Sequence, residues 1–225
     1  DAITDKTKAI LINSPNNPTG AIFPKETLQA IADICLKYDL WLVSDEVYST
    51  VTFGAEHFSP CALDNMAERT ITINSLSKSH AMTGWRLGWL VGPEALAEHL
   101  GNLALCMLFG CPSFIQEAAK VALTSPLPEL AQMRETYLQR RDTLFSLLNA
   151  IAGIDCHLPD GGMFLMLDIR RTGMDSQQFS DLLLDKFDVA VLPGVAFGPS
   201  GEGHVRLSLG VSERELIKAA ERIAK

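Results

Sequence analysis

Four short polar segments contain the residue types of a catalytic site, and each comes at or just beyond the end of a predicted strand. Along the chain they are Asn13–Gly20, Ser44–Tyr48, Asn74–Lys78 and Gly84–Gly88. Ligands of open α/β sheets bind outside the carboxyl ends of the strands. We therefore expect the four segments to contribute to one ligand site.

Lys78 is the candidate nucleophile among these residues. A lysine amine attacks a carbonyl only while it is uncharged, and neighbouring cations together with partial burial lower its pKa. Ser75 and Ser77 precede Lys78 in the chain and Arg86 follows it. The alternatives are a solvated surface lysine and the Ser-x-x-Lys motif of serine acyltransferases, whose companion Ser-Asp-Asn and Lys-Thr-Gly segments are missing from the sequence.

The elements that must position these segments alternate between strand and helix in the first part of the chain. Short apolar runs predict buried strands, and apolar residues at helical spacing predict helices. The predicted strands are 8–13, 40–45, 69–74 and 85–91, and the predicted helices are one that begins at Pro24, 94–108 and 113–124. This alternation is typical of an α/β domain.

The second part of the chain has a different pattern. Residues 127–151 have the apolar spacing of a long connecting helix, and after it the sequence predicts strands 163–169, 189–192 and 204–209 with helices 176–187 and from Ser212 onward. Ser212 and Glu215 form a capping-box pattern. We therefore expect two domains, 1–130 and 131–225, the second of α+β type with the connecting helix at its start.

The composition limits the classes of function. The net charge of −8 and the lack of a recurring Lys/Arg stripe argue against nucleic acid, and no apolar stretch approaches the roughly 20 residues that span a bilayer. Five scattered cysteines without a C-x-x-C pair predict neither a disulfide framework nor a zinc site and favour a cytoplasmic setting. His57 and His80 lack partners at ligand spacing, so we expect no metal.

Taken in order, the four segments resemble the signature of class I and II aminotransferases of pyridoxal-phosphate (PLP) fold type I, and Arg206 adds a further match. The resemblance covers essentially the whole chain. It implies a mixed, mostly parallel sheet in a large domain, a smaller α+β C-terminal domain, PLP as cofactor, and a homodimer. It also implies that the large domain is truncated at its N-terminus, with Asp1 at a cut point. We therefore expect that residues 1–225 alone either self-associate through unpaired strand edges and lack transaminase activity, or are a proteolysed remnant whose missing half remains bound.

The resemblance assigns four residues to the cofactor ring. Lys78 corresponds to the lysine that forms the Schiff base with PLP, and Asp45 to the carboxylate that pairs with the protonated ring nitrogen and so keeps the ring an electron sink. Tyr48 and Asn17 correspond to the pair that hydrogen-bonds the ring hydroxyl oxygen. The Asn17–Pro18 peptide bond is expected to be cis, as in relatives. Read without the resemblance, Asp45 could cap a helix and Tyr48 could belong to the core.

The resemblance assigns other residues to the cofactor phosphate and the substrate. Ser75, Ser77 and Arg86 match the phosphate-binding positions, where hydroxyls and a guanidinium fork suit the anion. Arg206 matches the arginine that binds the substrate α-carboxylate in bidentate fashion, and Asn17 is expected to contact substrate as well. The alternative for Arg206 is an ion pair with Glu202 or Glu213.

The reaction implied is ping-pong transfer of an amino group between an L-amino acid and a 2-keto acid such as pyruvate, with Lys78 also moving the α-proton. A carbon–sulfur β-lyase or a decarboxylase of the same fold would share Lys78 and Asp45 and stays open. A non-enzymatic PLP-sensing regulatory module would need an attached DNA-binding domain. Asn102–Met107 and Pro159–Phe164 resemble bacterial arginine–pyruvate transaminases, but the sequence leaves the amino donor undecided.

Overall fold

The computed structural model describes residues 2–225, which form two compact units. The first unit consists of the chain up to Pro15 together with Ile22–Leu130, and the second consists of Asn16–Ala21 together with Ala131–Lys225. Residues 16–21, which the sequence places inside the expected domain 1–130, thus make their contacts with the second unit. We call Asn16–Ala21 the strap.

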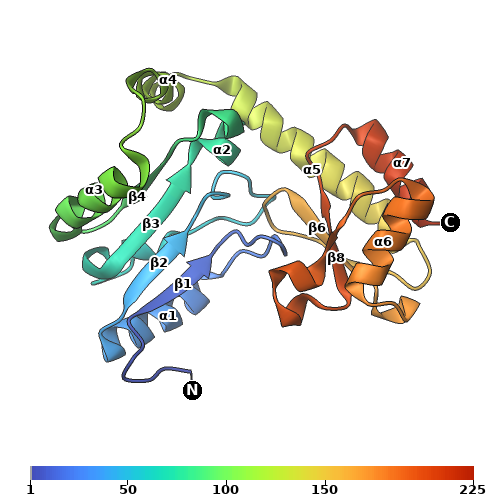
Figure 1. Ribbon diagram of the computed structural model, residues 1–225, viewed down its shortest axis with the longest axis horizontal. Coiled ribbons are helices and arrows are strands. Elements are labelled where there is room, and N and C mark those ends of the chain that lie inside the picture. The colour runs from blue at the N-terminus through green and yellow to red at the C-terminus, as the bar shows by residue number, and fades with distance from the viewer. Residues whose placement is uncertain (1) are drawn as a thin grey trace. The chain divides into compact units, whose positions relative to one another are not determined.

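The sheet of the first unit is mixed and mostly parallel (Figure 1). Its order is β1 (Ala9–Asn13), β2 (Trp41–Asp45), β3 (Thr70–Ser75) and β4 (Gly88–Val91), and only the β3–β4 pair is antiparallel. The three parallel strands end at one edge of the sheet, where Asn13 pairs with Asp45 and Asp45 with Ile73. This edge carries three of the four polar segments at strand ends.

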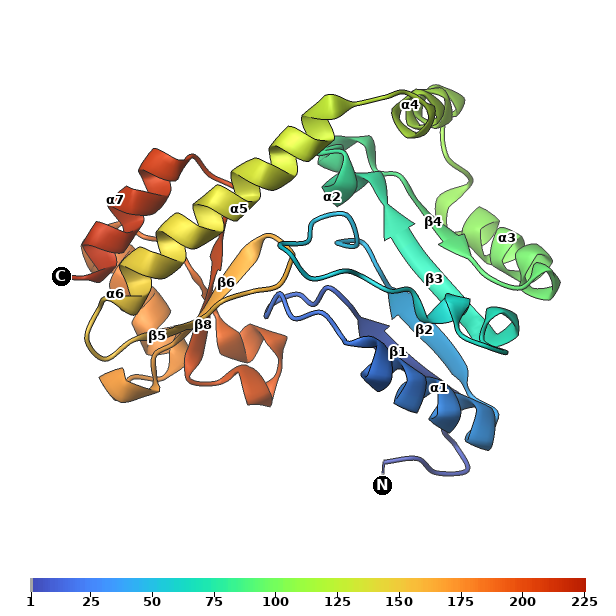
Figure 2. The ribbon, with the colours of Figure 1, turned by 180° about the vertical axis from the view of Figure 1, so that it is seen from behind.

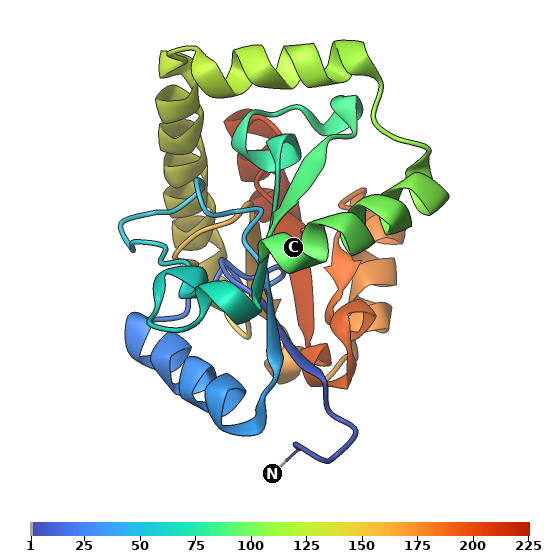
Figure 3. The same ribbon diagram turned by 90° about the vertical axis from the view of Figure 1, so that its left-hand side faces the viewer.

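Helix α1 (Lys25–Tyr38) supplies the core of the first unit. Its buried residues Leu28, Ala32 and Cys35 pack in one cluster with Ile12, Leu40, Leu42, Leu63 and Met66. Full burial of one such leucine side chain contributes about 1.5–3 kcal/mol. The helices that follow β4 are α3 (Glu94–Leu108) and α4 (Ser113–Thr124), which stand apart from α1 (Figure 3).

Three details of the first unit differ from the sequence expectation. Pro24 is the N-cap of α1 with extended backbone, rather than its first helical residue. The strand expected at 85–91 begins only at Gly88, because Arg86 has a left-handed conformation with φ +54° that no strand residue adopts. The short helix α2 (Leu76–Ser79) was not expected from the sequence, because it has too few residues to show a periodic pattern.

The second unit contains an antiparallel sheet in the order β5 (Asp155–His157), β6 (Phe164–Asp168), β8 (His204–Ser208) and β7 (Leu192–Pro193). The helices of this part of the chain are α5 (Pro128–Asn149), α6 (Ser176–Phe187) and α7 (Glu213–Ile223) (Figure 2). The strand expected at 189–192 is therefore wrong for all but its last residue. Strand β5 was not expected because three residues give no readable alternation.

Alternation along β8 separates the core of the second unit from its functional face. Val205 and Leu207 are buried, whereas His204 and Arg206 point to the opposite face and are half-buried. The predicted capping box of α7 is confirmed, since Ser212 and Glu215 bond each other's backbone N–H groups. A second capping box, at Asp175, begins α6.

The remaining short elements are 3-10 turns at Pro60–Ala62, Ala67–Arg69, Thr83–Trp85, Arg170–Thr172, Gly194–Phe197 and Pro199–Gly201. The Asn17–Pro18 bond is cis as expected, and so is Ser14–Pro15. Among residues 2–225, no helix combines the length and apolar character needed to cross a bilayer. The same residues contain no cluster of three or more His, Cys, Asp or Glu side chains suited to a metal ion.

Candidate functional site

The end of β2 is fixed from both neighbouring strands. The Asn13 side-chain amide and the Ser14 backbone N–H both donate to the carbonyl oxygen of Asp45, each at 3.1 Å. On the other side, the Glu46 N–H donates to the carbonyl oxygen of Ile73 at 2.9 Å. The backbone that carries Asp45 is therefore held in place before any ligand is considered.

Asp45 and Tyr48 lie in the turn that follows β2. The half-buried Asp45 carboxylate accepts a hydrogen bond from the Val47 N–H at 3.2 Å through Oδ1. Tyr48 is 4% exposed, and its carbonyl oxygen accepts from the Val51 N–H at 2.8 Å. The turn thus presents an acceptor carboxylate at the sheet edge and anchors the phenol ring in packed surroundings.

Lys78 lies on α2, directly after β3, and is half-buried. The Ser75 hydroxyl caps this helix by accepting from the Ser77 N–H at 3.0 Å, and it donates to the carbonyl oxygen of Leu87 at 3.0 Å. Ser75 therefore sets the direction of α2 relative to the segment that leads into β4. The lysine is positioned by a defined local structure instead of a free loop.

Arg86 is the cation of the fourth segment. It is exposed, and its Nη1 donates to the carbonyl oxygen of Thr83 at 2.9 Å. A guanidinium has five N–H donors, so this bond leaves donors for an anionic ligand. The space beside this segment is tight, since a Cβ at Gly88 would lie 2.8 Å from the Asn74 carbonyl oxygen.

Glu46, next to Asp45, belongs to a buried polar cluster that the sequence did not reveal. Its Oε1 accepts from the Ser44 hydroxyl at 2.9 Å and the Ser59 hydroxyl at 2.6 Å, and His57 Nε2 lies 3.0 Å from its Oε2. Glu46 is 4% exposed. Because side chains alternate along a strand end, Glu46 ties the back of the turn to loop residues 57–59 while Asp45 faces the other way.

The hydrogen bonds of this cluster decide the ionisation of Glu46. Burial by itself would raise its pKa, but the hydrogen bonds from His57, Ser59 and Ser44 outweigh burial and hold the pKa below its ordinary value. The carboxylate form is therefore the form that the folded protein prefers.

In the second unit, Arg206 is held by one amide and two aromatic rings. Its Nη1 donates to Asn17 Oδ1 at 2.7 Å, and its Cζ lies 3.9 Å from the ring centre of Phe164 and 4.9 Å from that of Phe197. The two rings fix the guanidinium plane by cation–π contact. The expected alternative, an ion pair with Glu202 or Glu213, is not what the structure shows, since Glu202 bonds Ser176 and Glu213 bonds Thr143.

The strap that carries Asn17 is closed on itself. Asn16 Oδ1 accepts from the Thr19 N–H at 3.2 Å and from the Thr19 hydroxyl at 2.8 Å. The Gly20 N–H donates to the Asn16 carbonyl oxygen at 2.8 Å, and the Asn16 N–H donates to the Ala21 carbonyl oxygen at 2.9 Å. These bonds leave Asn17 at the tip of a small, rigid loop.

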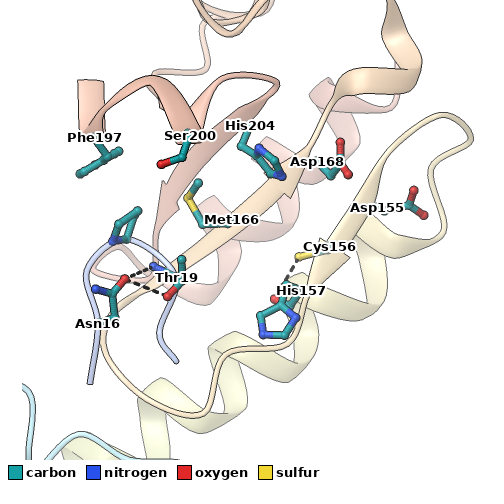
Figure 4. Close-up of a pocket in the computed structure, with 12 residues that line it drawn as sticks. Asn16, Thr19, Asp155, Cys156, His157, Met166, Asp168, Phe197, Ser200 and His204 are labelled. Carbon is teal, nitrogen blue, oxygen red and sulfur yellow. Dashed lines mark hydrogen bonds between the residues drawn. The ribbon is translucent and has the colours of Figure 1, made fainter. Parts of the chain in front are cut away.

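A cavity of about 580 Å³ lies beside the strap, within the second unit (Figure 4). Figure 4 shows strap residues on one side, Met166 and Asp168 of β6 at the floor, and His204 and Phe197 opposite Asp155–His157. Met166 is the cross-strand partner of Arg206, so the cavity lies on the functional face of the sheet.

Two ionisable groups of this cavity, Asp168 and Cys156, have shifted pKa values. Hydrogen bonds from Arg170 lower the pKa of Asp168 to about 2, so its carboxylate is ionised and paired. Burial raises the pKa of the Cys156 thiol to about 12, so it stays protonated near neutral pH. The cavity can therefore bind polar or aromatic groups but offers no thiolate for covalent chemistry.

Comparison with known proteins decides the family. The family model described as aminotransferase class I and II matches residues 1–223. The chain belongs to the class I and II aminotransferases. Members of this family generally use PLP, and the mixed, mostly parallel sheet with a second α+β unit is their fold type I. The expectation drawn from the four motif segments is thus confirmed at the level of family and fold.

Individual relatives of this aminotransferase chain carry different substrate names. It is 56% identical over 222 residues to the arginine–pyruvate transaminase of Pseudomonas aeruginosa, covering 99% of the chain and 56% of that protein. Among solved structures, an aromatic aminotransferase from Pyrococcus horikoshii is 42% identical with a TM-score of 0.96, covering 99% of the chain and 60% of that protein. An aspartate aminotransferase from Thermus thermophilus, solved with maleate, is 39% identical with a TM-score of 0.91, covering 99% of the chain and 58% of that protein. The chain thus spans a little over half the length of the relatives it matches.

The structure groups the expected site residues into two sets. Asp45, Tyr48, Ser75, Ser77, Lys78 and Arg86 belong to the first unit, and Asn17 and Arg206 are bonded to each other in the second. Sequence reasoning missed Phe164, Phe197 and Glu46. Only Phe164 had a signal in the sequence. It lies two positions before Met166 on the strand that follows the Gly161–Gly162 turn, so the alternation of side chains along a strand places both on one face.

We predict that Glu46→Gln destabilises the protein by about 1–3 kcal/mol at pH 7, because a buried group loses its charge-assisted hydrogen bonds. A lowered pKa stabilises the fold at pH values above the ordinary value of 4.5, and that stabilisation is lost as pH falls through the folded-state pKa. The difference between wild type and Glu46→Gln should therefore shrink below pH 4.5, measured by urea unfolding at several pH values.

Glu56→Gln is the matched control, because Glu56 is exposed and next to His57. It should change stability little at any pH. A Glu46→Gln difference that stays constant from pH 7 to acid would contradict the proposed ionised cluster.

Proposed function

We propose that the protein is a PLP-dependent aminotransferase that moves an amino group between an L-amino acid and a 2-keto acid such as pyruvate by a ping-pong mechanism. The observation that carries the proposal is the placement of Lys78 just after β3, while Asp45 ends the neighbouring strand β2, in a chain of the aminotransferase family. When bound, PLP supplies an electron sink for the bond broken at the substrate α-carbon.

The donors and acceptors of the first unit fit such a cofactor. The Asp45 carboxylate, oriented by the Val47 N–H, suits a protonated ring nitrogen, and the Tyr48 phenol suits the ring hydroxyl oxygen. Ser77 and the remaining N–H donors of Arg86 suit a phosphate. The Ser75 hydroxyl donates its only proton to the Leu87 carbonyl oxygen and accepts from the Ser77 N–H, so we assign Ser75 chiefly to holding α2. A hydrogen bond to the phosphate would require the Ser75 proton to turn away from Leu87.

Lys78 has two tasks in this proposal. Its amine would hold the cofactor, and when it is not attached to the cofactor the same amine would accept the α-proton of the substrate. A short helix capped by Ser75 limits the directions that the Lys78 side chain can take. This restriction keeps the amine close to the atom that loses the proton.

Asn17 and Arg206 bind the substrate in the proposal. The planar Arg206 guanidinium, held between two phenylalanine rings, presents its fork to an α-carboxylate. The Asn17 amide orients that fork through Oδ1. An amide N–H is also the kind of donor that suits a cofactor ring oxygen or a substrate carboxylate. We further propose that 1–130 belongs to the large domain and 131–225 to the small domain, and that the enzyme is cytoplasmic, which the free state of its cysteines supports.

We predict that Lys78→Ala in the full-length protein lowers kcat by at least ~10³-fold, because the mutation removes the group that both attaches the cofactor and moves the proton. The assay follows transfer from a panel of L-amino acids to pyruvate, with the keto acid product identified. The visible absorbance band of covalently attached cofactor should also disappear. Transfer at the wild-type rate by Lys78→Ala would refute the aminotransferase proposal. Release of ammonia or carbon dioxide by the wild-type protein without amination of pyruvate would refute it as well.

We predict that Arg206→Lys weakens amino acid and keto acid substrates alike by roughly 1–3 kcal/mol, because lysine keeps the charge but loses the planar fork. The measurement is KM for both substrates and the cofactor absorbance of the same preparation. Cofactor binding should stay at the wild-type level. A matching loss of PLP affinity would show that Arg206 has a structural role instead.

The proposal includes a homodimer, supported by the unburied apolar surface of α3. No residue of α3 is buried, although most of its second half is apolar. Leu103, Leu105, Met107 and Leu108 are each at least half exposed, and Phe109 after them is 90% exposed. A contiguous apolar surface of this kind marks a contact with another protein surface, and closed two-fold dimers are the commonest assemblies of soluble proteins.

We predict that the full-length protein sediments as a dimer and that Leu105→Asp shifts it toward monomer, because a carboxylate on an apolar contact must be desolvated. His99→Asp, which adds a carboxylate to an exposed polar position of the same helix, should leave the dimer intact. Analytical ultracentrifugation over a range of concentrations measures both. A monomeric wild-type protein would refute the homodimer, and an intact Leu105→Asp dimer would place the interface elsewhere.

A further inference from the structure

Arg141, on α5, is a buried cation that has no role in the proposed amino-group transfer. It is 8% exposed, and burial of a guanidinium is unfavourable unless its charge and its N–H groups are paired. Its Nε and Nη2 bind the neighbouring Asp142 carboxylate at 2.8 and 2.7 Å. Both nitrogens contact the same oxygen, Oδ1, so this ion pair offsets the charge of Arg141 and restricts its guanidinium.

Arg141 also makes a hydrogen bond to a residue outside the helix. Nη1 donates to the carbonyl oxygen of Pro159 at 3.0 Å, and Pro159 is itself buried. Arg141 therefore ties α5 to the loop between β5 and β6. The loop lies outside the regular strands, so a buried donor at this point helps to fix where its backbone lies.

The same loop holds the strap. The N–H groups of Asp160 and Gly161 both donate to the carbonyl oxygen of Gly20, at 3.1 and 2.9 Å. There is no room to spare at this contact, because a Cβ on Gly20 would lie 2.3 Å from Pro159 Cβ and 2.6 Å from the Gly161 carbonyl oxygen. With φ at +72°, Gly20 also has a backbone conformation that favours glycine.

The strap in turn orients the guanidinium of Arg206. Asn17 lies in the loop that Gly20 closes, and its Oδ1 accepts the 2.7 Å hydrogen bond from Arg206. A continuous series of contacts thus runs from Arg141 through Pro159–Gly161 and Gly20 to Asn17 and Arg206. All of these residues belong to the second unit.

From this series we infer that Arg141 is a positioning residue for the carboxylate-binding group Arg206, acting through the strap. The inference rests on the proposed role of Arg206 in binding the α-carboxylate. Arg141 touches neither substrate nor cofactor; it fixes the loop against which the strap packs. A displacement of the strap rotates or releases the Asn17 amide and so loosens the Arg206 fork, which must hold a near-planar geometry to bind a carboxylate.

The test measures carboxylate binding separately from catalysis. Propionate has a carboxylate and no amino group to react, and its dissociation constant for the full-length protein is measured by ligand-observed NMR. We expect Arg141→Met to weaken propionate about tenfold, the equivalent of roughly 1.4 kcal/mol, and to raise KM for both substrates with kcat and cofactor absorbance little changed. Arg141→Lys, which keeps a charged donor, should recover part of the affinity.

Two controls separate positioning from a general loss of stability. Arg134→Met removes an exposed arginine from the same helix and should bind propionate like wild type. The double variant Arg141→Met/Asn17→Ala should be little weaker than Asn17→Ala alone, because both changes act on one series of contacts. If Arg141→Met fails to fold, Gly20→Ala disturbs the same contact from the strap side and should give the same tenfold loss.

Three results would overturn the inference. Wild-type propionate binding by folded Arg141→Met or Gly20→Ala would show that the loop does not control the carboxylate site. Full additivity with Asn17→Ala would show that Arg141 acts independently of the strap. If Arg206→Lys left propionate binding unchanged, the proposed role of Arg206 would be refuted and the inference with it. If Arg206→Lys weakened propionate binding but Arg141→Met and Gly20→Ala did not, only the role of Arg141 would be refuted.

Discussion

The register of the parallel strands is the constraint on which the first unit depends. Because β1, β2 and β3 run in the same direction and pair in register, their carboxyl ends meet at one edge of the sheet. The residues just beyond these ends have left the strand ladder, so their side chains and part of their backbone are free to bind a ligand. The bonds from Asn13, Ser14 and Glu46 then fix the backbone of the middle strand end at Asp45. In the proposed function this would orient the Asp45 carboxylate before the cofactor binds, so that little has to be reorganised during the reaction.

The strap has a comparable role in the second unit. It brings Asn17 to Arg206, a separation of 189 positions along the chain. Backbone hydrogen bonds hold most of this arrangement, so it depends little on the side chains of the neighbouring loop. The exception is the contact between Gly20 of the strap and Pro159 of the loop, where a side chain on Gly20 would collide with Pro159. The buried Arg141 adds a side-chain hydrogen bond to the carbonyl oxygen of Pro159 in that loop. The geometry proposed to bind the substrate would thus be built from the backbone and supported by one buried cation.

Two charged groups show how their surroundings set their chemistry. Arg206 stacks on Phe164 and Phe197, which shield its guanidinium from water and strengthen its attraction for a carboxylate. Glu46 is buried as well, yet its hydrogen bonds from Ser44, Ser59 and His57 keep it ionised. Arg206 is half-buried and its guanidinium lies against two aromatic rings, whereas Glu46 is buried and both of its carboxylate oxygens are bonded within the protein. The partners of each charged group therefore say more about its role than its burial does.

The sequence by itself determined the family, the mixed α/β fold and the long helices. The helices 94–108, 113–124 and 176–187 have the bounds expected from apolar periodicity, because enough turns repeat to make the period readable. The motif residues Lys78, Asp45 and Arg206 were also chosen from the sequence, since their chemical types and order form a family pattern, although their roles remain proposals. Short elements such as α2 and β5 escaped because a few residues contain no period. Only the tertiary structure decided that the strap belongs with the second unit, that two phenylalanine rings and Asn17 hold Arg206, and that Arg141 and Glu46 are buried among specific partners. These facts depend on contacts between residues far apart in the chain, and local sequence patterns contain no information on which distant backbone groups will pair.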